Sequence, residues 1–381
     1  MQKRARCLLL ALMVLLLCAV PVGAADLGIS APSAILMEKS TGQILYEQDA
    51  HTRLAPASVT KVMTLLLVME ALDDGRITWD DTVTASAAAA AKGGSQIYLE
   101  ENEQMPLRDM LKSVVVSSAN DCACALAEHI AGSETAFVAM MNERAEQLGM
   151  TDTHFVNCTG LDDGADAGEH LTSAYDIALM SRALLQHEEI KQYTTIWMDT
   201  VRNGTFGLSN TNKLVRFYDG TTGLKTGFTS GAGYCLSASA ERGGMELIAV
   251  VMHCDTSAHR FESAKALLNY GFSNYALVTP TPPEAIPAVP VTLGHTESII
   301  PVLKDTTPIL IDKAKASSVQ SSITVDDGVT APVEKGQQLG LLRVTAGDEA
   351  IAEIPLVAPE AVAALTWWDV MGQMLRALCM A

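Results

Sequence analysis

Positive charge is scarce in this chain of 381 residues, which has 26 lysines and arginines against 44 aspartates and glutamates. The first 25 residues hold Lys3, Arg4 and Arg6 and no acid, so the remainder is more negative than the formal −18 of the whole chain. An acidic surface repels phosphate backbones and anionic headgroups. We therefore expect no nucleic-acid partner.

The N-terminal apolar run is too short to cross a membrane. It extends from Leu8 to Val20, about thirteen residues, whereas a spanning helix needs roughly 20. Basic residues precede this run and small residues (Gly-Ala-Ala, 23–25) follow it, which is typical of a secretory signal peptide. We therefore interpret residues 1–25 as a signal peptide and predict an exported protein at the outer face of the cytoplasmic membrane or in the cell wall.

Cysteine and aromatic residues are also few, with eight cysteines and 5% aromatics. Cys122 and Cys124 lie two apart on a predicted helix and point to different faces, so this pair predicts no metal site. Cys235 and Cys254 flank a predicted hairpin, and a disulfide between them is one interpretation. Buried free thiols are favoured, because a chain of this length needs no disulfide to fold. We expect no metal and no cofactor.

Apolar periodicity predicts two structured regions. A β-hairpin around 34–46 and three strands between 224 and 253 enclose a mainly helical region, which indicates one mixed sheet covered by helices. Five prolines between 279 and 290 mark a domain boundary, and the alternating runs beyond it predict a small all-β domain. Helices are predicted at 59–72, 85–91, 107–117, 121–130, 136–148, 173–185 and 263–270.

The chain ends in a predicted amphipathic helix over residues 361–381. On a helical wheel Asp369, Gln373 and Arg376 form one narrow face, and the opposite face is apolar. The helix is too short to span a bilayer but suits the interface, with its tryptophan pair at headgroup depth. A membrane surface is therefore a predicted partner, and docking of the helix on the all-β domain is the alternative.

Three short motifs follow one another along the chain: Ser58-Val59-Thr60-Lys61, Ser118-Ala119-Asn120 and Lys225-Thr226-Gly227. Each is common by chance. Taken singly, Ser58 is better explained as a helix cap and Lys61 as a solvated lysine. Together and in this order, the motifs predict a serine nucleophile with two supporting segments.

The chemistry of these motifs begins with the serine, whose hydroxyl becomes a nucleophile when a base removes its proton. A helix starting at Ser58 places Lys61 one turn on and on the same face, so Lys61 is the expected base. It must be uncharged, and burial and a nearby cation, expected from Lys225, both lower its pKa. Ser118 is expected to relay the proton to the leaving amine, and Asn120 to hydrogen-bond a substrate amide.

The third motif is the predicted substrate-binding segment. Lys225, Thr226 and Gly227 form a strand expected to pair with an extended peptide, and the glycine permits close approach of backbone and ligand. The backbone N–H groups of Ser58 and Phe228 are the candidate oxyanion hole.

With their contexts, these motifs resemble the serine-type D-alanyl-D-alanine carboxypeptidases, a family of low-molecular-mass penicillin-binding proteins. The resemblance implies an α+β fold. In it a β-lactamase/transpeptidase-like catalytic domain (26–278), with mixed helices on an antiparallel sheet, precedes a β-rich domain (279–360) and a membrane-anchoring helix (361–381). The matching stretches are 54–61, 93–97, 118–121, 173–176 and 223–227.

The resemblance also implies the reaction. Ser58 attacks the carbonyl between the two terminal D-alanines of a peptidoglycan stem pentapeptide, and water then hydrolyses the acyl-enzyme. β-Lactam antibiotics are implied inhibitors that acylate the same serine. The substrate carboxylate is implied to bind Thr226 and an arginine, for which Arg216 and Arg260 are the candidates. Asp176 matches a buried family aspartate.

Other functions stay open. A class A β-lactamase shares the motifs but needs a glutamate in an E-x-x-L-N sequence, and the nearest sequence, Glu169-His170-Leu171-Thr172, has the wrong spacing. A non-catalytic penicillin-binding envelope protein is disfavoured because all three motifs are intact. The sequence does not distinguish carboxypeptidase action from transpeptidase or endopeptidase action on cross-links. Thr159 precedes Gly160, so no histidine at that position assists deacylation.

Overall fold

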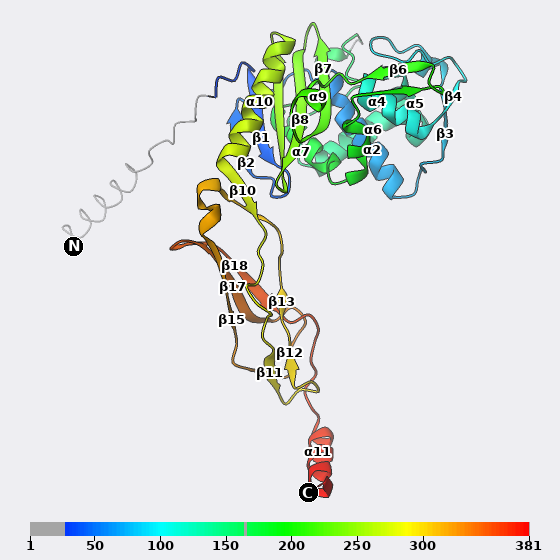
Figure 1. Cartoon of the computed structure of the whole chain (residues 1–381). Coiled ribbons are helices and arrows are strands. Elements are labelled where there is room, and N and C mark those ends of the chain that lie inside the picture. The colour runs from blue at the N-terminus through cyan, green and yellow to red at the C-terminus, as the bar shows by residue number, and fades with distance from the viewer. Residues whose placement is uncertain (1–26, 164–165, 381) are drawn as a thin grey trace, which may run out of the picture.

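The computed structural model describes residues 27–163 and 166–380, so the predicted signal peptide lies outside the described residues. The larger lobe contains a five-stranded antiparallel sheet in the order β2-β1-β9-β8-β7 (Figure 1). The predicted N-terminal hairpin is confirmed and joins the sheet through β1, which pairs with β9. The strands are β1 (Ser33–Glu38), β2 (Ile44–Gln48), β7 (Thr221–Thr229), β8 (Gly233–Arg242) and β9 (Met245–Cys254).

Both faces of this sheet are covered by helices. Leu247 and Val251 of β9 belong to the apolar cluster shared with α10, and the alternate residues Ile248 and Val250 belong to the cluster shared with the other helices. The helices are α2 (Lys61–Asp73), α3 (Ala87–Ala90), α4 (Leu107–Ser117), α5 (Asn120–Ala131), α6 (Glu134–Gln147), α7 (Ala174–Leu184), α8 (Lys191–Thr194), α9 (Leu214–Phe217) and α10 (Ser257–Asn274), with 3-10 turns η1 (Ala57–Thr60), η2 (Ala167–Glu169) and η3 (Glu188–Ile190).

Two helices differ from their predicted lengths. The alanine-rich helix is only α3, because Ser86 caps its start and Gly93 and Gly94 follow soon after its end. The last helix of the lobe, α10, begins well before 263, because the Thr256 hydroxyl accepts a hydrogen bond from the His259 backbone N–H and caps the first turn.

Short strands make up the rest of the chain. Two antiparallel pairs, β3–β4 and β5–β6, flank the helices of the larger lobe. The second region holds a three-stranded sheet (β12-β11-β16) and a four-stranded sheet (β13-β18-β17-β15), and the pair β10–β14 lies nearest the larger lobe (Figure 1). These strands are β3 (Thr82–Thr84), β4 (Gln104–Pro106), β5 (Met198–Val201), β6 (Phe206–Ser209), β10 (Tyr275–Val278), β11 (Val289–Thr292), β12 (Ser298–Ile299), β13 (Val302–Leu303), β14 (Ile309–Asp312), β15 (Val319–Val325), β16 (Val329–Thr330), β17 (Gln338–Ala346) and β18 (Glu349–Val357), with η4 (Lys313–Ser318).

The terminal helix, α11 (Trp367–Met380), lies at the far end of the molecule from the larger lobe (Figure 1). Asp369 caps it by accepting hydrogen bonds from the backbone N–H and hydroxyl of Thr366. Trp367 and Trp368 are exposed, at 63% and 76% of their surface. Within the described residues, no helix combines the length and the apolar character that crossing a bilayer requires.

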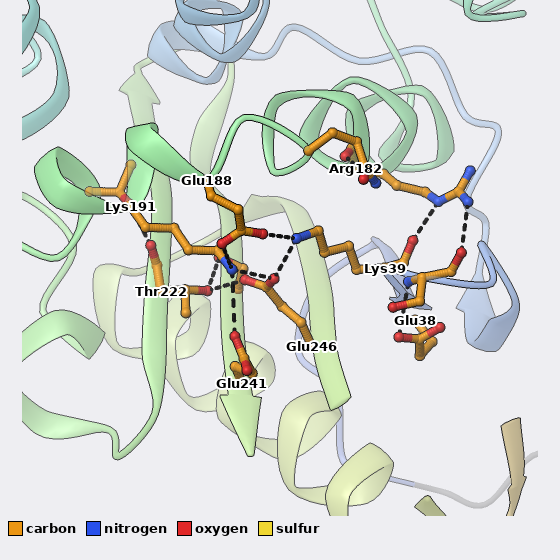
Figure 2. A network of polar contacts seen from close by, with 12 residues as sticks. Glu38, Lys39, Arg182, Glu188, Lys191, Thr222, Glu241 and Glu246 are labelled. Atoms are coloured by element: carbon orange, nitrogen blue, oxygen red, sulfur yellow. Dashed lines mark hydrogen bonds and ion pairs between the residues drawn. The ribbon is translucent and has the colours of Figure 1, made fainter. Parts of the chain in front are cut away.

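A buried polar network fixes one end of the five-stranded sheet (Figure 2). Glu246, at the start of β9, is 4% exposed and accepts ion pairs from Lys39 and Lys191 at 3.1 and 2.8 Å. It also accepts a 2.6 Å hydrogen bond from Thr222 of β7. Burial works to lower the pKa of Lys191, but the ion pairs with Glu188 and Glu246 outweigh it and raise the pKa above its usual value. The network therefore ties the edge strand β7 to β9.

We expect Glu246→Ala to lower the free energy of unfolding by about 2–4 kcal/mol, because it leaves two largely buried ammonium groups with fewer partners. Urea denaturation measures the change. The matched control is Asp74→Ala, which removes an ion pair to Arg76 whose side chains are 65% and 41% exposed. A much smaller change is expected there. Equal effects of the two variants would contradict the structural role of the network.

Candidate active site

The first motif lies where the helix cluster meets β7. Ser58 lies in the η1 turn, and Lys61 follows it as the first residue of α2. The Lys61 Nζ atom is 2.9 Å from Ser58 Oγ and donates a 2.7 Å hydrogen bond to the Thr159 carbonyl. The expected pairing of serine and lysine is therefore present, and Thr159 is an additional partner that fixes the amine.

Burial makes Lys61 an unusual lysine. Its side chain has no exposed surface, and burial lowers its pKa from 10.5 to about 7, although the nearby Cys158 and Asp121 side chains work against this. Lys225, the expected nearby cation, is itself 1% exposed. Burial, and then the charges of Lys61 and Arg260, hold its pKa well below its usual value. Desolvation is thus the main reason why the amine beside Ser58 loses its proton near neutral pH.

The turn that presents Ser58 depends on a glycine from a distant segment. Ala57 has a positive φ of 47°, rare for a residue with a Cβ. Its carbonyl faces Gly160, where a Cβ atom would lie 1.8 Å from the Ala57 oxygen and 2.7 Å from Thr60 Oγ1. The sequence indicated Gly160 only as a neighbour of Thr159. The structure shows that it allows the close approach of two backbones behind Ser58.

We expect Gly160→Ala to abolish acylation, since the clash must displace the η1 turn and with it Ser58. Gly149→Ala is the matched control, because Gly149 also has a positive φ (74° against 82°) but a Cβ atom added there would meet no atom within 4 Å. Labelling with a fluorescent penicillin compares the two variants. Full labelling of Gly160→Ala, or equal loss in both variants, would contradict the role assigned to Gly160.

The second motif forms the turn between α4 and α5. Ser118 has a left-handed backbone (φ 63°), is 3% exposed, and its Oγ atom has no hydrogen-bond partner among the described residues. Asn120 donates from Nδ2 to the Gly93 carbonyl at 2.7 Å, and its buried Oδ1 atom has no partner within that part of the chain. Asp121 accepts from the backbone N–H groups of Ile97 and Leu99. The motif therefore holds the 93–99 segment in place.

The third motif lies on β7, the edge strand of the sheet, which packs against η1. A Cβ atom at Gly227 would lie 2.5 Å from the Pro56 carbonyl oxygen and 3.1 Å from the Ser58 nitrogen, so this glycine brings β7 against the η1 turn. Lys225 donates to the Thr226 carbonyl at 2.9 Å, and Thr226 Oγ1 lies 2.6 Å from Thr211 Oγ1. Thr211 is a partner that no sequence motif indicated.

Among the described residues, neither candidate arginine hydrogen-bonds the threonine pair. Arg216, on α9, is exposed and makes no hydrogen bond or ion pair through its side chain within the described part of the chain. Arg260 is 7% exposed and donates to the carbonyls of Gly227 and Cys235, so it supports β7 and β8. Phe228, the other candidate oxyanion residue, has a half-exposed ring packed on Tyr234.

His170 is a further buried group behind Ser58, and the sequence did not indicate that it contacts this turn. Its Nδ1 atom accepts from the Val156 backbone N–H at 3.0 Å, so Nε2 carries the proton and lies 2.7 Å from Thr60 Oγ1. The threonine hydroxyl donates to the Ala57 carbonyl. Burial lowers the pKa of His170 to about 4, so it stays neutral and braces the η1 turn.

Two acidic residues bear on the alternatives considered above. Glu169, the nearest sequence match to a β-lactamase glutamate, is exposed, and within residues 27–163 and 166–380 no carboxylate hydrogen-bonds Ser58 or Lys61. Asp176 is buried at the start of α7 and accepts from the Asp152 backbone and the Thr153 hydroxyl, while burial raises its pKa. Asp176 therefore organises the turn before the 154–160 segment.

Comparison with known proteins identifies the family. The family model described as D-alanyl-D-alanine carboxypeptidase matches residues 21–256, more than half of the chain. The chain belongs to the D-alanyl-D-alanine carboxypeptidase family. A second model, for the C-terminal domain of penicillin-binding protein 5, matches residues 284–364. The resemblance, the predicted enzyme class and the α+β fold with a following all-β region are thereby confirmed.

Individual relatives agree with this family assignment. The carboxypeptidase chain is 42% identical to the D-alanyl-D-alanine carboxypeptidase DacF of Bacillus subtilis (strain 168) over 344 residues, 88% of this chain and 86% of that relative. Penicillin-binding protein 5 of Haemophilus influenzae superposes with a TM-score of 0.74 at 32% identity, covering 88% and 98% of the two chains. Penicillin-binding protein D2 of Listeria monocytogenes in the ampicillin-bound form gives 0.59 at 33%, covering 65% and 99%.

The cysteines of the carboxypeptidase are free where the structure describes them. Cys122, Cys124, Cys158, Cys235 and Cys254 are all buried and unpaired by disulfides. The favoured interpretation of buried thiols is confirmed, and the alternative bond between Cys235 and Cys254 is absent. A bulge in the β8–β9 pairing sets Tyr234, rather than Cys235, opposite Cys254.

Proposed function

We propose that this chain removes the terminal D-alanine from peptidoglycan stem pentapeptides through an acyl-enzyme on Ser58. The observation that carries the proposal is the 2.9 Å contact between Ser58 Oγ and a fully buried lysine amine with a pKa of about 7. A neutral amine at this distance accepts the hydroxyl proton as the serine oxygen bonds to the substrate carbonyl carbon.

Acylation then breaks the peptide bond. The backbone N–H groups of Ser58 and Phe228 stabilise the oxyanion of the tetrahedral intermediate. The proton taken by Lys61 passes through Ser118 to the nitrogen of the departing D-alanine, and the acyl ester remains on Ser58. The free Oγ atom of Ser118 supports this relay, because it has no competing partner among the described residues. Water then attacks the ester carbonyl: Lys61 takes one proton from the water and gives it to Ser58 Oγ as the ester bond breaks, which frees the shortened peptide and restores the enzyme.

The substrate lies between the second motif and β7 in this proposal. The edge strand pairs with the extended peptide, and the unpartnered Oδ1 atom of Asn120 accepts from a substrate amide. The terminal carboxylate is bound by the hydroxyls of Thr226 and Thr211, whose 2.6 Å separation supports a shared anion site. Arg216 is not needed in this arrangement, because its side chain is exposed and unpaired within the described residues.

β-Lactams are proposed to acylate Ser58 and to be released slowly. Their ring carbonyl meets the same nucleophile and base. Fast hydrolysis needs a carboxylate that activates water beside the ester, and Glu169 is exposed. Slow release also distinguishes this function from that of a β-lactamase, which would turn over a chromogenic cephalosporin without a lasting adduct.

We also propose that the chain is exported by its N-terminal segment and held at the membrane surface by α11. The exposed Trp367, Trp368, Met374 and Leu375 support an interfacial role for this helix, because such apolar side chains bind at headgroup depth. The helix lies far from the larger lobe (Figure 1), which would keep the proposed active site away from the bilayer.

Release of D-alanine from a synthetic stem pentapeptide, followed by mass spectrometry, tests the proposed function. We expect a product shorter by one D-alanine with the parent protein and none with Ser58→Ala. A dimeric, cross-linked product would instead indicate transpeptidation. Penicillin labelling without any peptide product would indicate a non-catalytic binding protein.

A further inference from the structure

A second chemical cluster lies outside the proposed active site, between α5, α6 and the segment that follows α6. It consists of Cys124 on α5, Glu134 at the start of α6, and Cys158. One ligand atom from each of the three residues lies within 4.8 Å of the others. We propose that these three residues bind one thiophilic divalent cation of the zinc class.

The distances fit a tetrahedral ion. The Sγ atom of Cys158 is 3.2 Å from Glu134 Oε1, and the Sγ atom of Cys124 is 3.9 Å from Glu134 Oε2. Zinc bonds of about 2.3 Å to sulfur and about 2.1 Å to oxygen, at tetrahedral angles, separate sulfur from oxygen by about 3.6 Å and two sulfurs by about 3.8 Å. Each observed contact lies within about 0.4 Å of the first value, and the second value lies within the 4.8 Å limit.

The charges also balance. Lys92 donates to Glu134 at 2.5 Å, so the cluster holds one ammonium and one carboxylate beside two buried thiols. Binding replaces the two thiol protons by one divalent ion, and both protons leave to solvent. The net charge of the cluster is the same before and after, which avoids an uncompensated charge in a largely buried place. Glu134 and Lys92 are 23% and 22% exposed, so they give the ion a route from solvent.

Cys122 shows how specific the arrangement is. It is buried on the same helix, two residues from Cys124, yet it is not part of the three-residue group. Only the fold brings Cys158 to Cys124, and the C-x-C spacing in the sequence could not indicate this pair. A bound ion would cross-link two helices to the 157–160 segment.

That segment supports the proposed base. The Cys158 carbonyl accepts a 2.7 Å hydrogen bond from Thr64 of α2, and the next carbonyl, of Thr159, accepts from Lys61. The ion would therefore stabilise the segment that contacts Lys61, and it takes no part in the bond-making steps.

Zinc titration of the full chain, reduced with a phosphine and freed of metal by a chelator, tests the site. We expect one equivalent to bind, with release of about two protons measured by calorimetry in buffers of different ionisation heat. At a hundredfold excess over Kd, Tm should rise by about 5 °C or more. Cobalt in place of zinc should give a sulfur-to-metal charge-transfer band.

Cys124→Ser and Cys158→Ser should each weaken zinc binding by about 100-fold or more, and Glu134→Gln by about 10-fold. Cys122→Ser is the matched control and should bind as the parent does. Circular dichroism establishes whether each variant is folded. If a serine variant does not fold, the weaker zinc binding expected of Glu134→Gln still tests the site. No binding by the parent, equal loss in Cys122→Ser, or a Cys124–Cys158 disulfide that forms in place of the metal site would overturn the proposal.

Discussion

Replacing Ser58 by alanine is expected to remove the covalent penicillin adduct and to lower D-alanine release on the order of 10^6-fold. The reason is that Lys61 has only two hydrogen-bond partners for its amine in the described structure, the Ser58 hydroxyl and the Thr159 carbonyl. Without the hydroxyl, the proposed base has no oxygen nucleophile to activate. Fluorescent labelling on gels measures the adduct, and a D-alanine assay measures the reaction.

Ser118 of the second motif and Ser117, the residue before it, provide the controls. Ser118→Ala should keep a penicillin adduct that forms more slowly, because this residue is expected to relay a proton and not to attack. Ser117→Ala, its neighbour at the end of α4, should react as the parent does. An adduct that survives in Ser58→Ala, or that maps to Ser118 by peptide mass, would mean that a different residue is the nucleophile.

Replacing Lys61 by methionine is expected to lower the acylation rate constant by about 10^2–10^4-fold. The change removes the proposed base while nearly keeping the volume of the buried side chain. The variant should be at least as stable as the parent at pH 7. The pKa of Lys61 is lower in the folded protein than in the unfolded chain, so burying this lysine costs free energy at pH 7, and methionine avoids that cost. Stopped-flow acylation and thermal unfolding measure the two effects separately.

The control is a largely buried lysine elsewhere. Lys112→Met removes a side chain that is 16% exposed and pairs with Asp109 and Asp199. Lys112→Met should lower the free energy of unfolding and leave the acylation rate constant unchanged, which is the opposite of the result expected for Lys61→Met. Parent-like acylation by Lys61→Met would remove Lys61 from the mechanism.

Much of this site could be predicted because its chemistry is local in sequence. Ser58 and Lys61 are one turn apart, and a short-range rule of helix geometry is enough to pair them. Helix α4 was predicted with its observed bounds, since its apolar periodicity is regular and Ser118 adopts the left-handed conformation that ends it.

The parts that escaped prediction depend on contacts between distant segments. Gly160 leaves no room for a Cβ atom because it meets Ala57, and Thr211 matters because it meets Thr226. No periodicity or motif in one sequence indicates such pairs. The N-terminal start of α10 was missed for another reason, since its capping Thr256 is a local signal that was overlooked.

The central claim is that an uncharged Lys61 draws the proton from Ser58, and the pH dependence of acylation tests it most directly. Burial lowers the pKa of Lys61 to about 7, and the base acts only when unprotonated. The second-order rate constant for acylation by a β-lactam without titrating groups in this range should therefore rise with pH and level off above about 7. In Lys61→Met the rise should vanish. A parent rate that is constant from about pH 5 to 9, or that keeps rising toward the ordinary pKa of lysine, would contradict the claim.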